Sequence, residues 1–266
     1  MADIDWQKEL LPYEQAVDEL VVKFNGIKRD YERLERQCPI HQVIGRVKRV
    51  SSIIEKANRR SIPIEDAIDR LEDIAGIRII CRFVSDIEQV AEIIRRRSNF
   101  DMKIVEEEDY ITNTKPSGYR SYHITIKYPI VFAQSTKEVI CELQIRTMSM
   151  NFWATIEHSL RYKYEGNIPD DIKSRLKKSA EAAFSLDREM DLIRNEMFSA
   201  IRTIQSKEGI VEKIIGNIHR LYDVKGFDKT SEYNNEFINL YREGRINKLV
   251  EFNNELESLV ELYKEE

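Results

Sequence analysis

The sequence predicts an α/β (α+β) fold, with a mixed β-sheet flanked by helices, an N-terminal helix and a helical C-terminal extension. Three observations predict it: an apolar stripe of helical spacing near the N-terminus, alternating helix-type and strand-type patterns up to residue 146, and only helical patterns beyond Pro169. A chain of 266 residues can bury a sizeable core. We expect one domain over residues 1–198, with an N-terminal helical element at 5–37, and a separate helical extension over 199–266.

Composition and charge restrict the class of protein. A charged fraction of 33% beside 42% hydrophobic residues is typical of a soluble, helix-rich chain. The net charge of −5 argues against a protein that coats nucleic acid, so any phosphate-binding site must be local. No signal peptide or membrane-length apolar run is present in the sequence. Cys38, Cys81 and Cys141 lack metal-site or disulfide spacing. Cys81 and Cys141 lie in apolar strand-like runs, which indicates buried thiols in a reducing compartment, and a cytoplasmic protein is expected.

The first helix is predicted by apolar residues that alternate spacings of three and four. These residues are Leu10, Tyr13, Val17, Leu20, Phe24, Ile27, Tyr31 and Leu34. The stripe ends near Cys38-Pro39, and it must pack either on the body of the protein or on another subunit.

Residues 52–97 are predicted to form three helices and one strand. Ser52-Ile-Ile-Glu55 has the form of a capping box, which indicates a short helix over about 52–60. A second helix is expected over 63–73, because its proline stands in the favoured first turn. The segment IRIICRF (77–83) is typical of a strand, and a capped helix follows over about 85–97.

Three more strands and a series of helices follow. Strand-type patterns lie at about 102–106, 119–128 and 138–146, and a helix is expected over about 147–164. Three glycines are expected to break the later helices: Gly209, Gly226 and Gly244. The extension either packs as an addition to the core or offers a surface to a partner or another subunit.

Each main strand presents one polar row, because successive side chains of a strand alternate faces. The rows hold Arg78 and Arg82, then Tyr119, Ser121, His123, Thr125 and Lys127, and then Glu138, Ile140, Glu142, Gln144 and Arg146. A sheet with one solvated face is one interpretation. The mixture of acids, amide, imidazole, tyrosine and arginines favours instead the floor of a site for a charged, aromatic ligand.

Residues 45–60 form a local excess of positive charge. They contain Arg46, Lys48, Arg49, Lys56, Arg59 and Arg60 against the single acid Glu55. Because helix N-terminal amides and the Ser52 hydroxyl add donors, this segment favours a polyphosphate partner. A solvated helix face and RNA binding are the alternatives, although no aromatic residues for base stacking are interleaved. The sequence contains no GxxxxGK[ST] loop.

Two acids stand near the edges of predicted strands. Asp73 lies where a helix passes into a strand, and Glu142 lies on a polar row. Brought together from neighbouring strands, they would suit Mg²⁺, which binds few protein oxygens together with substrate phosphates. Asp73 alone is also compatible with a turn residue, whereas an unpaired Glu142 in a buried strand would be costly.

Five segments, in order, resemble the synthetase domain of the Rel/Spo stringent-response enzymes, and more narrowly the stand-alone small alarmone synthetases of bacteria. They are GRVKRVSSIIEK, LEDIAGIRIIC, TKPSGYRSYH, ELQIRT and MNFWATIEHSLRYK. The resemblance covers residues 20–195 approximately. It implies a nucleotidyltransferase-like fold that transfers the β,γ-pyrophosphate of ATP to the ribose 3′-OH of GDP or GTP, which makes ppGpp or pppGpp.

The resemblance also implies site residues for the ATP half. Arg46 and Arg78 match the pair that sandwiches adenine. The residues that match the grip on the ATP phosphates are Lys48, Ser52, Lys56 and Arg59. Asp73 and Glu142 match the Mg²⁺ carboxylates, and Glu142 also matches the acceptor of the 3′-OH proton. These two acids, with Lys48 and Lys56, form the implied catalytic set.

In the acceptor half, Tyr119 matches the tyrosine that stacks on guanine. The rest of the acceptor pocket is matched by Lys115, His123, Gln144, Asn151 and Ala154. His158 shares a helix face with Asn151 and Ala154, and a structural role is favoured for it.

Departures from the family pattern limit what is carried over. No adjacent His-Asp pair exists, so the hydrolase of longer members is not expected. Residues 41–44 lack the aromatic and threonine with which some small synthetases bind their product, and Ser117 replaces the usual asparagine. Relatives form symmetric tetramers, so a homo-oligomer is expected. Neither a membrane partner nor stable nucleic-acid binding is expected, although RNA remains a possible partner. A toxin-type relative that modifies adenosine nucleotides or the tRNA 3′ end, and an inactive nucleotide- or RNA-binding module, are the alternative functions.

Overall fold

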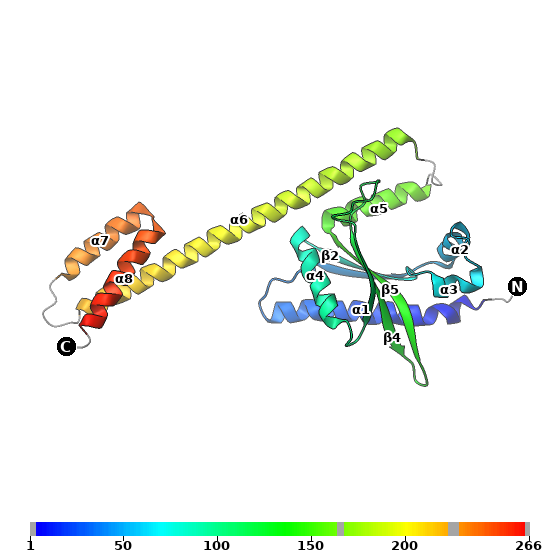
Figure 1. Cartoon of the computed structure of the whole chain (residues 1–266), viewed down its shortest axis with the longest axis horizontal. Helices are drawn as coiled ribbons and strands as arrows, with labels where there is room; N and C mark the ends of the chain where they lie inside the picture. The colour runs from blue at the N-terminus through cyan, green and yellow to red at the C-terminus, as the bar shows by residue number, and fades with distance from the viewer. Residues whose placement is uncertain (1–3, 164–167, 223–228, 264–266) are drawn as a thin grey trace. The chain divides into compact units, whose positions relative to one another are not determined.

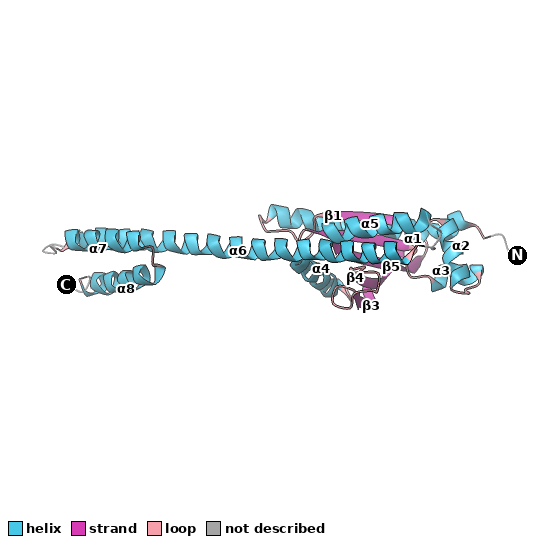
Figure 2. Ribbon diagram, turned by 90° about the horizontal axis from the view of Figure 1, so that it is seen from above, coloured by secondary structure: helices cyan, strands magenta, loops and turns pink. Residues whose placement is uncertain are grey.

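The computed structural model describes residues 4–163, 168–222 and 229–263, which divide into two compact units, Met1–Asp191 and Leu192–Glu266 (Figure 1). The boundary between the units falls within helix α6 (Asp170–Tyr222), shortly before the 198/199 boundary expected from the sequence. Among the described residues, strands occur only in the first unit, and the second is entirely helical (Figure 2). The predicted α/β class with a helical extension is confirmed.

Five strands form one mixed sheet in the first unit. They are β1 (Gln42–Val47), β2 (Ala75–Cys81), β3 (Lys103–Asp109), β4 (Tyr122–Val131) and β5 (Thr136–Thr147). Their order across the sheet is β1-β2-β5-β4-β3. Only the central β2–β5 pair is parallel, and the other three neighbouring pairs are antiparallel.

Helices cover both faces of this sheet. The long helix α1 (Trp6–Arg33) lies along one face, and α5 (Met148–Lys163) lies on the opposite side (Figure 1). α4 (Val84–Arg97) shares the hydrophobic core with α1 and with the apolar rows of the central strands. The predicted N-terminal stripe from Leu10 to Phe24 is buried in that core, so it packs on the body of the protein.

The approach of α1 to β1 depends on a glycine. A Cβ atom at Gly45 would lie 2.5 Å from Cγ1 of Val17 and 2.6 Å from Cγ2 of Val21, both on α1. Only a residue without a side chain lets the helix pack this closely on the strand. This contact therefore fixes the position of β1, which carries the basic segment that follows.

β1 is not among the strands predicted from the sequence. Its residues QVIGRV contain a glycine and a charge, and they lack the continuous apolar pattern that marks the other strands. β1 is an edge strand that pairs antiparallel with β2, with Gly45 opposite Ile77. Its extended conformation therefore depends on tertiary pairing more than on local preference.

The connection from β1 to β2 also differs from expectation. α2 (Val50–Arg59) begins before Ser52, and its N-cap residue Arg49 makes no side-chain capping bond, so the predicted capping box is wrong. The helix expected over 63–73 is instead a 3₁₀ turn at Ile64–Asp66 followed by the short α3 (Ala67–Arg70). Asp73 consequently lies in a turn that leads directly into β2.

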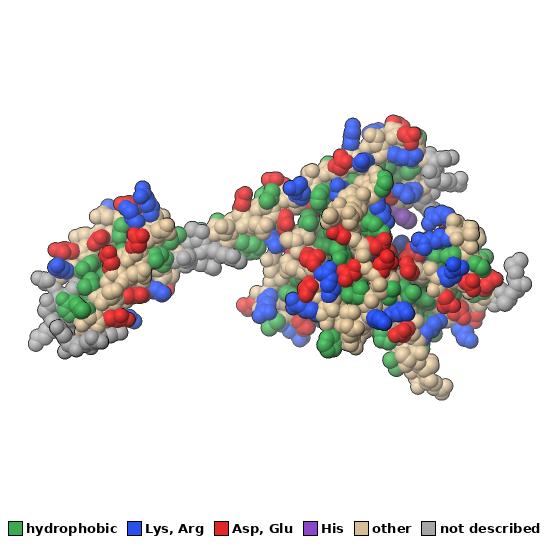
Figure 3. All heavy atoms as spheres, in the orientation of Figure 1, with side chains coloured by type: hydrophobic (Ala, Val, Ile, Leu, Met, Phe, Trp, Pro, Cys, Tyr) green, Lys and Arg blue, Asp and Glu red, His purple; other side chains and the backbone are tan. Residues whose placement is uncertain are grey.

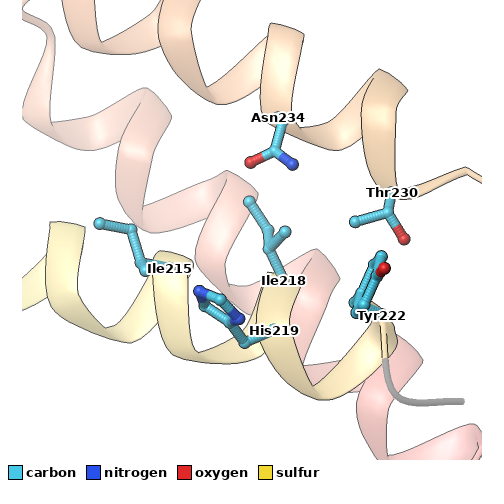
Figure 4. Close-up of a pocket in the computed structure, with 6 residues that line it drawn as sticks. All are labelled: Ile215, Ile218, His219, Tyr222, Thr230 and Asn234. Carbon is cyan, nitrogen blue, oxygen red and sulfur yellow. The ribbon is translucent and has the colours of Figure 1, made fainter.

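The second unit is a small helical bundle with its own core. The last turns of α6 pack with α7 (Thr230–Glu243) and α8 (Ile246–Leu262). Its buried apolar residues are Ile214, Ile218, Leu221, Leu249, Phe252, Leu256 and Val260. A pocket opens between α6 and α7, and Ile218 points from α6 toward Asn234 of α7 (Figure 4).

The predicted helix breaks have three outcomes. Gly244 ends α7 in the left-handed conformation with φ of +73°, as expected for a C-terminal glycine. Gly209 does not break α6, which runs through it, so that prediction is wrong. Gly226 lies outside the described residues.

Two further expectations concern the cysteines and membrane-spanning helices. Cys38, Cys81 and Cys141 are free and buried, and burial is predicted from the sequence for Cys81 and Cys141. Within the described ranges, no helix combines the length and the apolar character needed to cross a bilayer.

Replacing Gly45 by alanine is expected to lower the free energy of unfolding by about 1–3 kcal/mol, because the new methyl group would overlap Val17 and Val21 on α1. Urea denaturation of the purified full-length chain measures the change. The matched control is Gly76→Ala on the neighbouring strand, where a Cβ would meet only the Arg46 carbonyl oxygen at 3.8 Å. Equal stability losses in the two variants would contradict the close packing of α1 on β1.

Candidate active site

A continuous polar surface lies on one face of β2, β5 and β4. Arg78 of β2 pairs with Gln144 of β5, which pairs in turn with His123 of β4. In the next row Glu142 pairs with Gly76 of β2. The strand register therefore brings the predicted polar rows together on one surface.

A chain of hydrogen bonds crosses this surface. The Tyr119 hydroxyl lies 2.8 Å from Nε2 of His123, and Nδ1 of His123 lies 2.9 Å from Oε1 of Glu142. Nε2 of Gln144 donates to Oε2 of Glu142 at 2.6 Å. Because a carboxylate only accepts, Nδ1 of a neutral His123 carries the proton, and Nε2 accepts from the Tyr119 hydroxyl. Four predicted site residues thus form one network.

This network determines the charge of Glu142. Burial raises the pKa of the Glu142 carboxyl, but hydrogen bonds from His123 and Gln144 outweigh burial and leave that pKa below its ordinary value of 4.5. The negative charge of Asp73 also acts on Glu142 in the upward direction, which indicates that the two acids are neighbours. Glu142 is therefore an ionised carboxylate at neutral pH.

Asp73 is held between two lysines. Lys48, which follows β1, and Lys56 of α2 approach the same Oδ2 atom of Asp73 at 2.7 and 2.6 Å. Burial raises the pKa of Asp73, yet hydrogen bonds from both lysines more than offset burial and lower the pKa below 3.8. The other oxygen, Oδ1, is buried and has no hydrogen-bond partner. Three members of the predicted catalytic set are thus joined in one cluster.

The other residues of α2 that were predicted to bind ATP border this cluster. Ser52 is half-buried, and Arg59 is exposed in the last turn of α2. Their spacing from Lys56 places all three on one side of the helix. Figure 3 shows Lys and Arg side chains gathered over α2 on the face in view.

Arg46 and Arg78 lie on the same face of neighbouring strands. Arg46 pairs with Gly76, two residues from Arg78 along β2. Burial, followed by the charges of Arg146 and Arg46, lowers the pKa of Arg78. The pKa of His158 on α5 is lowered by burial and then by Arg46 and Arg78, so this histidine faces the two arginines.

The loop that carries Tyr119 is shaped by Gly118. This glycine has φ of +90°, a conformation that other residues rarely adopt. A Cβ atom there would lie 2.7 Å from Cβ of Ala180 on α6, so the loop packs directly on that helix. Nζ of Lys115 lies 3.8 Å from the ring centroid of Tyr110 and 5.4 Å from that of Tyr119. Lys115 and Tyr119 thus lie together, as predicted.

α5 forms the wall behind Tyr119. Ala154 is buried in a cluster with Trp153 and Ala180, and Tyr119 packs against this cluster. Nε1 of Trp153 donates to the Leu176 carbonyl oxygen of α6 at 2.9 Å. On the same helix Oδ1 of Asn151 is buried without a hydrogen-bond partner in the described structure. This oxygen is available to a ligand donor.

Two residues of this site, Arg146 and Tyr110, are not among the predicted site residues. Arg146 was placed on the polar row of its strand, and it donates to the hydroxyl of Tyr119 and to Oε1 of Gln144. Tyr110 follows the acidic strand β3 and packs edge-on against Tyr119 and His123. Strand alternation identified the face of Arg146, but no pattern marked Tyr110.

The chain is similar to proteins of known activity and structure. Residues 45–167 match the family model described as the region found in RelA / SpoT proteins. The GTP pyrophosphokinase YjbM of Bacillus subtilis is 50% identical over 208 residues, which cover 78% of this chain and 97% of that protein.

Solved structures agree with this match. The crystal structure of small alarmone synthetase 1 from Bacillus subtilis bound to its product pppGpp has a TM-score of 0.69 and 52% identity, covering 73% of this chain and 98% of that chain. The structure of that synthetase bound to AMPCPP has a TM-score of 0.66 and 49% identity, covering 74% and 100%.

The lysine clamp on Asp73 predicts a pH dependence of stability. Because the folded-state pKa is depressed, the clamp contributes stability above the ordinary pKa of 3.8 and loses it as the pH falls through the folded-state value. Asp73→Asn is therefore expected to cost about 2 kcal/mol at pH 7 and progressively less below pH 3.8. Denaturant unfolding in EDTA, from pH 7 to pH 2.5, measures the difference.

The control is the same substitution in a background with Lys48→Met and Lys56→Met. Without the lysines, burial alone acts on the carboxyl, so Asp73→Asn should no longer be most costly at neutral pH. A cost that stays constant over the pH range in the native background would contradict the clamp.

Proposed function

Because this chain belongs to the RelA/SpoT family of alarmone-synthesising GTP pyrophosphokinases, we propose that it transfers the β,γ-pyrophosphate of ATP to the ribose 3′-OH of GDP or GTP. The observation that carries the proposal is the single polar face on which the Lys48–Asp73–Lys56 cluster lies beside the Glu142 network. Pyrophosphoryl transfer requires two nucleotides to be positioned, phosphate charge to be neutralised and a hydroxyl proton to be accepted. These two clusters offer groups for each task.

We propose that ATP occupies the side of β1 and α2. Lys48 and Lys56 are already oriented toward one point, and Ser52 and Arg59 extend the same side of α2. Clustered ammonium, guanidinium and hydroxyl donors suit a triphosphate. Arg46 and Arg78 lie further along the same face, where their planar guanidinium groups suit the two sides of an adenine ring.

Asp73 and Glu142 are proposed to bind Mg²⁺. The buried, unpartnered Oδ1 of Asp73 fits a carboxylate oxygen reserved for a cation. In the parts of the chain that the structure covers, no three His, Cys, Asp or Glu side chains are grouped to hold a metal ion. Substrate phosphates would therefore complete the ligand set, as Mg²⁺ prefers. When bound, the ion would neutralise charge on the phosphate oxygens.

Glu142 is proposed to accept the proton of the acceptor 3′-OH. Its carboxylate is ionised at neutral pH and is oriented by His123 and Gln144, so it is ready to accept a proton from a hydroxyl brought beside it. Tyr119 would stack on the acceptor base, beside Ala154 and the unpartnered Oδ1 of Asn151. Lys115 lies next to Tyr119 and suits the acceptor phosphates.

Assembly and location complete the proposal. We propose a homo-oligomer of the tetrameric type expected from the family resemblance. Leu186 and Met190 of α6 are exposed apolar residues in the first unit and suit a contact between subunits. The free buried cysteines support a reducing, cytoplasmic compartment.

The proposal predicts that the purified chain forms a 3′-pyrophosphorylated guanosine nucleotide when it is incubated with ATP, Mg²⁺ and GDP or GTP. Nucleotide chromatography detects the product, with GMP, ADP and tRNA tested as parallel acceptors. Transfer of γ-labelled phosphate to ADP or tRNA instead of GDP would favour the toxin-type alternative. Folded protein that modifies none of the acceptors would contradict the enzymatic proposal.

Glu142→Gln is expected to lower kcat by about 10²–10⁴-fold, because the amide keeps the shape of the side chain but cannot accept the 3′-OH proton. Equilibrium binding of ATP or GDP alone should change little. Steady-state kinetics and calorimetry measure the two quantities. Glu138→Gln, on the same strand near its other end, is the matched control and should retain full activity. Near-normal turnover by Glu142→Gln would refute the assignment of the base.

A further inference from the structure

Arg146 is a buried cation bonded to neutral groups. Its side chain is 4% exposed, and Nε donates to Oγ of Ser121 at 3.1 Å. Nη2 donates to Oε1 of Gln144 at 2.8 Å and to the hydroxyl of Tyr119. Burying a guanidinium among neutral partners costs desolvation energy that hydrogen bonds only partly recover. Packing alone does not account for a buried residue with this desolvation energy.

The guanidinium of Arg146 fixes the direction of the Tyr119 hydrogen bond. Because Arg146 donates to the hydroxyl oxygen, the single hydroxyl proton is free to point at Nε2 of His123. Burial raises the pKa of Tyr119 despite the opposing charge of Arg146, so the hydroxyl keeps this proton at neutral pH. His123 then presents its Nδ1 proton to Glu142.

The same guanidinium fixes the amide of Gln144. Its oxygen accepts from Arg146, so its nitrogen is turned toward Oε2 of Glu142 at 2.6 Å. Two hydrogen-bonded paths therefore begin at Arg146 and end on the two oxygens of Glu142. Both paths start at Nη2, while Nε donates to Oγ of Ser121 and so fixes the plane of the guanidinium. The ammonium of a lysine has no second nitrogen to make this additional bond.

We propose that Arg146 is a positioning residue of the acceptor site, which holds Tyr119 and Gln144 in the orientation that receives the acceptor nucleotide. The inference rests on the proposed function, because it concerns the same site. Arg146 acts through Tyr119 and Gln144, and it makes no hydrogen bond to the Lys48–Asp73–Lys56 cluster. Its one link toward the ATP side is the Gln144 oxygen, which also accepts a longer bond of 3.4 Å from Nε of Arg78. Loss of Arg146 should therefore weaken the binding of the acceptor more than the binding of ATP.

Arg146→Gln in the full-length chain is expected to raise the acceptor KM by about 10- to 100-fold, the range set by losing a charged hydrogen bond. The KM for ATP should stay within about twofold of the native value. Arg146→Lys should recover part of the acceptor affinity. Steady-state kinetics with each substrate varied in turn, and calorimetric binding of GDP alone, measure these effects.

The matched control is Arg95→Gln. Arg95 of α4 also donates to a tyrosine hydroxyl, that of Tyr122 at 2.8 Å, but its partner lies on the core-facing row of β4. Both KM values should therefore be unchanged. Tyr119→Phe, which keeps the ring and removes the hydroxyl, should reproduce a rise of about tenfold in acceptor KM. In the Tyr119→Phe background, Arg146→Gln should then raise the acceptor KM by a smaller factor than it does in the native background.

Equal rises in both KM values, or a normal acceptor KM in folded Arg146→Gln, would overturn the proposal. If Arg146→Gln does not fold, Tyr119→Phe decides, and a native acceptor KM in that variant overturns it equally. A native chain that forms no product contradicts the proposed function instead, and GDP calorimetry on the variants then tests the positioning role separately.

Discussion

The site depends on one interaction, the parallel pairing of β2 with β5 at the centre of the sheet. This pairing sets Arg78 opposite Gln144 and Gly76 opposite Glu142, so groups from distant segments meet on one surface. The pairing also brings the start of β2, which Asp73 shortly precedes, beside the strand that carries Glu142. A parallel pair requires a long crossover, and α4, β3 and β4 lie within it. A one-residue slip of β5 against β2 would turn Gln144 and Glu142 toward the apolar core and leave Arg78 without them.

The two halves of the site differ in their electrostatics. Near α2, two lysines neutralise one carboxylate, so the cluster remains attractive to further negative charge. Near β4, Glu142 receives hydrogen bonds from His123 and Gln144, so its negative charge persists. The first arrangement suits a polyphosphate, and the second suits a hydroxyl that must lose a proton. Their adjacency is what the proposed direct transfer between two nucleotides requires.

Periodicity predicted the elements whose stability is local or whose faces are strongly apolar, such as the N-terminal helix and β5. It failed for β1, where Gly45 and the flanking charges conceal a strand that exists because β2 and α1 hold it. It also failed at Gly209, because an exposed glycine inside a long helix costs only about 1 kcal/mol. The polar rows gave the face of each site residue, but bonds such as Lys56 to Asp73 or His123 to Glu142 depend on register, which the sequence alone does not reveal.

The contact between Gly118 and α6 has a consequence for where the catalytic unit ends. The loop that carries Tyr119 rests on Ala180, and Trp153 of α5 donates to the carbonyl oxygen of Leu176. Further along α6, Asp187 accepts a hydrogen bond at 2.6 Å from Thr147, which itself caps the first turn of α5. All three α6 residues lie beyond the matched family region, 45–167. We therefore expect the smallest fragment that forms this site to include α6 at least as far as Asp187. A boundary drawn at residue 167 would remove the helix on which the Tyr119 loop packs.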